Sequence, residues 1–75
     1  SLEDLMKQNG YKIACISDDK KIFIFTENNY NKKNLLGSIS KITNINIRYF
    51  ELIKLKYLPR TSNNKISYNE LKNRC

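Results

Sequence analysis

A single lysine is the residue of this chain best placed to do chemistry. Lys65 follows the polar segment 60–64, between an apolar segment that ends at Leu58 and a short helix expected after Ser67. A loop between two such elements presents the lysine as one cation on a rigid support. A compact ammonium on a long stem can stabilise negative charge that develops on a substrate. Lys65 is therefore a single anchored cation, and without further context an ordinary exposed lysine is the default interpretation.

The remaining residue types exclude most other chemistry. The chain contains no histidine and two cysteines, Cys15 and Cys75. The lack of histidine removes the Ser-His and Cys-His nucleophile pairs, and with only two cysteines no metal site is expected. Cys15 lies in an apolar strand pattern and Cys75 ends the chain, which favours a buried thiol and a frayed tail over a disulfide. Catalysis within these residues would have to use carboxylates or lysine.

The first half of the chain predicts a helix followed by a β-hairpin. A helix start is expected at Ser1, with Asp4 three residues on, and Gly10 ends that helix. Residues 11–17 and 21–26 read as strands joined by a turn at residues 18 and 19. Both faces of this hairpin are partly apolar, with Ile13 and Cys15 on one face. The hairpin should therefore be covered on both sides.

The second half predicts a helix, a strand and a last short helix. Asn31 is a good N-cap for a helix running to about Ile42, with one apolar face made by Leu35, Leu36, Ile39 and Ile42. Residues 49–58 read as a half-exposed strand in which Ile53, Leu55 and Tyr57 share a side. Pro59 stops this strand, and Ser67 with Glu70 forms a capping box for the last helix. We predict an α+β fold of order α-β-β-α-β-α, a small three-stranded sheet with helices packed on it.

Length and charge narrow the function classes. A chain of 75 residues makes one small domain without room for a deep cavity. It has no long apolar run and no signal peptide, so we expect a cytoplasmic protein. Residues 1–31 hold four lysines against five acidic residues, whereas residues 32–75 hold ten lysines and arginines against two acidic residues. The basic half would attract polyanions, coenzyme phosphates or an acidic protein, although a solvated surface is an equally good reading.

The segment from Leu58 to Leu71 resembles the closing motif of the adenylate-forming enzymes, the superfamily of acyl-CoA synthetases, non-ribosomal peptide synthetase adenylation domains and luciferase. In that family a loop of the type Leu-Pro-x-Thr-x-x-Gly-Lys-Ile carries a catalytic lysine. The matching residues here are Leu58, Pro59, Thr61, Lys65 and Ile66. Asn64 replaces the usual glycine, and asparagine is the residue that best substitutes where φ is positive. Ser67 and Tyr68 stand where the family commonly has Asp followed by Arg or Tyr.

The resemblance implies that residues 1–75 are a single C-terminal cap domain, a fragment of a larger AMP-forming carboxylic acid ligase. The hinge and the large N-terminal ATP-binding domain would precede Ser1. Lys65 would act in acyl or aminoacyl adenylation and bind a phosphate of ATP or of the acyl-adenylate. ATP and Mg²⁺ would be bound mainly by the absent domain, and the acceptor thiol would belong to CoA or to the phosphopantetheine of an acyl carrier protein. The isolated chain would be inactive.

Two alternatives come from other classes. One is a small basic nucleic-acid-binding module, which would contact phosphates through Lys32, Lys33, Lys41, Lys54 and Lys56. Tyr57, close to Lys54 and Lys56 in the sequence, would be its weak base-stacking candidate. No RNA- or DNA-binding signature accompanies the charge. The other is a module that docks on a carrier protein without chemistry of its own.

Overall fold

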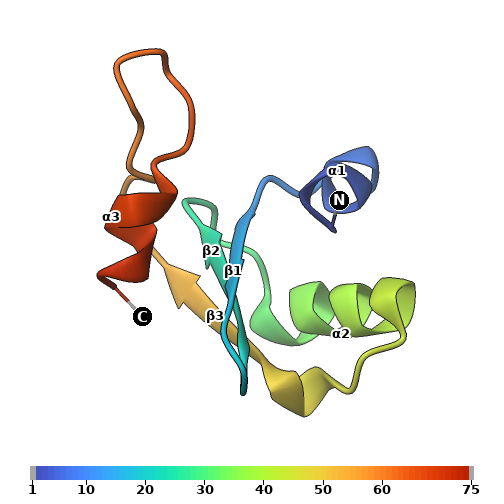
Figure 1. The fold of residues 1–75 in the computed structure, drawn as a ribbon. Helices are drawn as coiled ribbons and strands as arrows, with labels where there is room; N and C mark the ends of the chain where they lie inside the picture. The colour runs from blue at the N-terminus through green and yellow to red at the C-terminus, as the bar shows by residue number, and fades with distance from the viewer. Residues whose placement is uncertain (1, 75) are drawn as a thin grey trace.

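The computed structural model describes residues 2–74, so the expected helix start at Ser1 and the terminal Cys75 lie outside the described residues. The elements follow one another as predicted, in the order α-β-β-α-β-α (Figure 1). They are α1 (Leu2–Gln8), β1 (Ala14–Ser17), β2 (Ile22–Thr26), α2 (Lys32–Thr43), the 3-10 helix η1 (Ile47–Tyr49), β3 (Phe50–Lys54) and α3 (Tyr68–Lys72). None of the helices in this part of the chain combines the length and apolar character that a membrane crossing needs.

Strand β2 is the centre of a mixed sheet with the order β1-β2-β3. β1 and β2 form an antiparallel hairpin, and its turn is closed by Asp18, whose Oδ1 accepts hydrogen bonds from the N–H groups of Lys20 and Lys21 at 2.7 Å each. These bonds favour the ionised carboxylate and lower the pKa of Asp18. β3 runs parallel to β2, with Leu52 opposite Ile24. A parallel neighbour needs a crossover, and α2 lies in that crossover.

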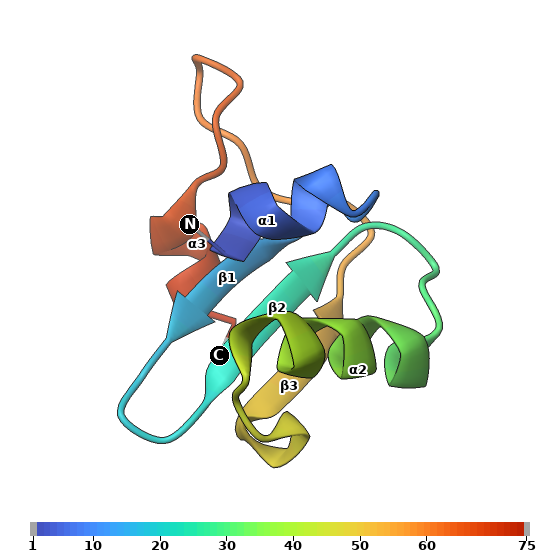
Figure 2. The ribbon, with the colours of Figure 1, turned by 90° about the vertical axis from the view of Figure 1, so that its right-hand side faces the viewer.

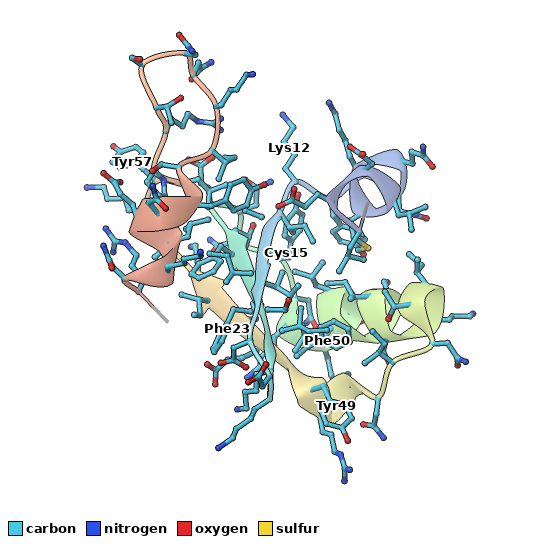
Figure 3. All side chains as sticks on the ribbon, viewed as in Figure 1. Lys12, Cys15, Phe23, Tyr49, Phe50 and Tyr57 are labelled. Carbon is cyan, nitrogen blue, oxygen red and sulfur yellow. The ribbon has the colours of Figure 1, made fainter. Side chains whose placement is uncertain are left out.

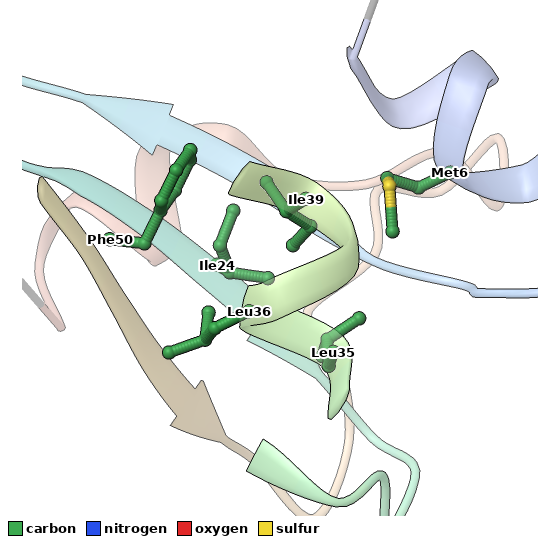
Figure 4. Packing of buried hydrophobic residues seen from close by; sticks show 6 residues of the cluster. All are labelled: Met6, Ile24, Leu35, Leu36, Ile39 and Phe50. Carbon is green, nitrogen blue, oxygen red and sulfur yellow. The ribbon is translucent and has the colours of Figure 1, made fainter. Parts of the chain in front are cut away.

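One face of the sheet is covered by α1 and α2 (Figure 2). Helix α2 begins at Asn31, whose Oδ1 accepts a hydrogen bond from the N–H of Asn34 at 3.0 Å, so the predicted N-cap is confirmed. Its apolar side packs on β2 and β3. The buried residues of this first core are Met6, Ile24, Leu35, Leu36, Ile39 and Phe50 (Figure 4).

The other face of the sheet is covered by the chain after β3. Side chains alternate along β2, so Phe23 and Phe25 point away from the first core, and Figure 3 shows Phe23 and Phe50 on opposite sides of the sheet. The buried residues of this second core are Ala14, Phe23, Phe25, Leu58 and Leu71. The prediction of a hairpin covered on both sides is confirmed.

Several local predictions are corrected by the structure. The first strand begins at Ala14 and not at residue 11. The third strand ends at Lys54 and not at residue 58, because its partner β2 ends at Thr26. Beyond β3, the N–H of Leu55 still donates to the carbonyl of Thr26 at 2.9 Å. Tyr57 is consequently 72% exposed instead of lying on the sheet.

The capping box and the outer end of the α2 face are also corrected. Ser67 precedes α3 without making a side-chain capping hydrogen bond, so burial of Leu71, rather than a cap, fixes this five-residue helix. Ile42 is 37% exposed, because it lies at the last turn of α2, beyond the edge of the first core.

Candidate functional site

Lys65 belongs to a small β-hairpin that we call the Lys65 hairpin, residues 59–67. Its stem is closed by a hydrogen bond from the N–H of Ser67 to the carbonyl of Pro59 at 2.8 Å. Arg60 and Ile66 form an antiparallel bridge above it. The N–H of Thr61 donates to the carbonyl of Lys65 at 2.7 Å. The backbone of the predicted loop is therefore ordered by its own ladder.

The tip of the hairpin depends on Asn64. The N–H of Asn64 donates to the carbonyl of Thr61 at 2.9 Å, and Asn64 has a φ of 63°. A three-residue loop whose last residue is left-handed is a common hairpin connection, and asparagine tolerates that conformation better than most residues. The expectation of a positive φ at Asn64 is confirmed. The turn therefore fixes the direction of the backbone at Lys65.

The side chain of Lys65 is open to solvent. Residues 61–65 are all exposed, and the hairpin extends away from the rest of the molecule above α3 (Figures 1 and 2). The ammonium of Lys65 has no hydrogen-bond or ion-pair partner among residues 2–74, and the N–H of this residue donates to Oγ1 of Thr61 at 3.4 Å. The cation is thus held by its backbone and not by a neutralising carboxylate.

Both arms of the hairpin are anchored in the second core. Leu58 and Leu71 flank the hairpin and are 7% and 0% exposed, and Ile66 packs against the same cluster. The N–H of Leu58 also donates to Oε2 of Glu27 at 2.9 Å. The polar tip therefore stands on an apolar base, tied to the end of β2 by one carboxylate.

A second carboxylate, Glu3 of α1, meets the outgoing arm. The hydroxyl of Tyr68 lies 2.7 Å from each carboxylate oxygen of Glu3, and the N–H of Cys15 donates to Oε2 at 2.8 Å. Burial, the hydrogen bond to Glu3 and its charge raise the pKa of Tyr68 to about 12. Burial and then Glu3 raise the pKa of Cys15 to about 12 as well, so its thiol stays protonated and is no nucleophile at neutral pH.

The basic residues of the second half lie on several elements. Lys32 and Lys33 line a surface depression of about 360 Å³ with Leu36 and Ile47, whereas Lys41 lines a separate one of about 260 Å³. Lys54 bonds Asn29, and the ammonium of Lys56 lies 5.8 Å from the ring centre of Tyr57. The structure does not gather these lysines around Lys65.

The described residues contain no group of three or more acidic or cysteine side chains that could hold a metal ion. The sequence pointed to Lys65 as a candidate but not to Glu3 or Glu27. These carboxylates contact residues that are distant in the sequence, and such contacts leave no local pattern. A search of protein-family models, of curated proteins and of solved structures finds no match to this chain.

Proposed function

We propose that this chain is the mobile C-terminal domain of an AMP-forming carboxylic acid ligase and that Lys65 supplies the cation for adenylation. One observation carries the proposal. Lys65 stands on an ordered hairpin that extends from the body of the molecule, and its ammonium has no partner among residues 2–74. A lysine in this position can enter a cleft that belongs to another domain.

The chemistry suits such a cation. In adenylation an oxygen of the acid's carboxylate forms a bond to the α-phosphorus of ATP. The bond from that phosphorus to the bridging oxygen breaks, and pyrophosphate leaves with the electron pair. Negative charge grows on the phosphate oxygens, and a fixed ammonium stabilises it more in the transition state than in the ground state. Lys65 would contact these oxygens.

The rest of the site would belong to a large domain that binds ATP, Mg²⁺ and the acid. In the second step a thiolate attacks the acyl carbon and AMP leaves, so the lysine is no longer needed and the small domain can turn away. The thiol would be that of CoA or of a carrier-protein phosphopantetheine, and the basic residues 32–75 suit either acceptor. The proposal includes a cytoplasmic location, where ATP and such thiol acceptors are available.

The test is Lys65→Ala in the intact protein that carries this chain. We expect acid-dependent pyrophosphate release to fall by about 10²- to 10³-fold, the loss typical for one electrostatic group in a transition state. Transfer from a preformed acyl-adenylate to the thiol should change little. Lys72→Ala, at an exposed lysine of α3, is the matched control. Equal loss in both steps, or no loss, would contradict the proposed role.

A second candidate, binding of single-stranded nucleic acid, has one observation in its favour. Tyr57 is 72% exposed with the Lys56 ammonium over its ring, and Tyr49 is 43% exposed with the Arg48 guanidinium 5.0 Å from its ring centre. Bases stack on such exposed aromatic side chains beside cations. Titration with a single-stranded oligonucleotide distinguishes the two functions, because tight and salt-sensitive binding lost in Tyr57→Ala would favour this one.

A further inference from the structure

The carboxylate of Glu3 joins three elements that are far apart in the sequence. Glu3 lies in the first turn of α1, Cys15 in β1 and Tyr68 at the start of α3. The N–H of Cys15 donates to Glu3 and not to β2, and β1 is an outer strand of the sheet. Glu3 therefore satisfies an amide at a free sheet edge while it accepts the hydroxyl hydrogen of Tyr68. Its position is fixed from two sides.

Tyr68 is close to the catalytic candidate along a constrained stretch of chain. It follows Lys65 by three residues, and between them Ile66 pairs with Arg60 and Ser67 bonds Pro59. Within that stretch the backbone has little freedom to absorb a change at Tyr68. The position of the Tyr68 ring is therefore transmitted to the stem of the Lys65 hairpin.

The apolar contacts at the base of the Lys65 hairpin hold the base against the second core, but they constrain the orientation of the hairpin less. Leu58, Ile66 and Leu71 are held by packing, which is not directional, whereas a hydrogen bond to a carboxylate is both directional and stronger than one between neutral groups. Glu27 bonds the incoming arm at Leu58, and Glu3 bonds the outgoing arm at Tyr68. Two carboxylates from the first half of the chain thus orient a hairpin of the second half.

We infer that Glu3 is a positioning residue for adenylation, which acts on Lys65 through Tyr68 and sets the direction in which the Lys65 hairpin points. This inference rests on the proposed function for its catalytic meaning. It assigns no contact between Glu3 and a substrate. A lysine displaced by about 1 Å from its working position can lose about 10²-fold in rate.

The first experiment uses amide hydrogen exchange of the 75-residue chain. Tyr68→Phe removes the hydroxyl and leaves Glu3 on the Cys15 amide. Tyr11→Phe is the matched control, because the hydroxyl of Tyr11 has no hydrogen-bond partner among residues 2–74. We expect exchange at the amides of Thr61 and Ser67 to rise roughly tenfold in Tyr68→Phe, while the amide of Ile24 keeps its protection and the control matches the parent. Unchanged exchange in the hairpin overturns the inference.

A second variant separates loss of the hydrogen bond between Glu3 and Tyr68 from general destabilisation. In the background of Glu3→Ala, the further change Tyr68→Phe should add nothing to hairpin exchange, since the bond is already absent. Additive effects of the two changes would show that Tyr68 acts through other contacts, and they overturn the inference.

The activity of the intact protein completes the test. In Tyr68→Phe we expect kcat for pyrophosphate release to fall about 10-fold or more, with KM for ATP and the rate of thiol transfer nearly unchanged. If Lys65→Ala abolishes adenylation and Tyr68→Phe does not reduce it, the positioning role is wrong although the proposed function stands. If Lys65→Ala itself keeps full adenylation, the proposed function is wrong, and the contact between Glu3 and Tyr68 then has no catalytic role.

Discussion

The two faces of the sheet are built by different means. The first core is formed by helices packed on strands, and three of its six residues come from the twelve-residue α2. The second core is closed by an irregular segment and by α3, which has five residues. A long amphipathic helix brings many apolar contacts with few loops. The C-terminal segment is held by Leu58, Ile66 and Leu71 and by a few hydrogen bonds.

The two faces differ in whether they carry Lys65. The face covered by α1 and α2 does not carry Lys65, and its longest helix contributes three buried residues to the first core. The face covered by the C-terminal segment carries the Lys65 hairpin, and because its core is smaller we expect that segment to open without loss of the whole fold. If Lys65 has the proposed role, the functional group lies on the face with the smaller core, and working loops are often drawn from the less stable parts of a protein.

The largest expected effect is on the first core. Ile39→Ala removes a side chain that is 0% exposed between α2 and the sheet, and it should lower the free energy of unfolding by about 3 kcal/mol. Ile42→Ala, three residues on and 37% exposed, is the control and should lower it by less than about 1 kcal/mol. Urea unfolding monitored by circular dichroism measures both. Equal losses would show that α2 does not carry the stability of the fold.

A smaller effect is expected on the second core. Leu71→Ala, at a residue that is 0% exposed, should lower the free energy of unfolding by about 1 to 2 kcal/mol, because α3 can detach before the sheet unfolds. Amide exchange should increase in the Lys65 hairpin and α3 and stay unchanged in α2. Exchange that increases equally in α2 would mean that the two faces unfold as one unit, which would end the distinction drawn above.

The smallest expected effect concerns the junction between the faces, where Glu3 meets Cys15 and Tyr68. Both side chains have a raised pKa, from 9.0 and 10.0 to about 12 in each case, so the folded state favours their neutral forms. The stability that these groups contribute is complete below the pKa of the unfolded chain and is lost as pH rises toward 12. The double variant Cys15→Ala, Tyr68→Phe should therefore lose less stability than the parent between about pH 9 and about pH 12. Parallel curves of unfolding free energy against pH would contradict this assignment.

The sequence predicted the order of elements because each depends on local chemistry. The pattern of Leu35, Leu36 and Ile39, the cap at Asn31 and the left-handed Asn64 are all properties of short segments, and all are confirmed. The predicted length of the third strand was wrong, because this strand can pair only as far as β2 extends.

The missed parts of the site depend on contacts between distant residues. Glu3 and Glu27 are ordinary charged residues in the sequence, and only the fold brings them to Tyr68 and to Leu58. The role of Lys65 stays a prediction that the experiments above can test.

The contact between Glu3 and Tyr68 also has a consequence for the order of folding. It spans 65 residues, whereas the bond between Thr61 and Lys65 near the tip of the Lys65 hairpin spans four. Closing a loop about sixteen times longer costs roughly 2.5 kcal/mol more in chain entropy, so this contact should form after the sheet and both cores have assembled. The Lys65 hairpin can therefore form early, and we expect its connection to α1 through Tyr68 and Glu3 to form late. During folding, we therefore expect Lys65 to be in place on its hairpin before the hairpin is connected to α1.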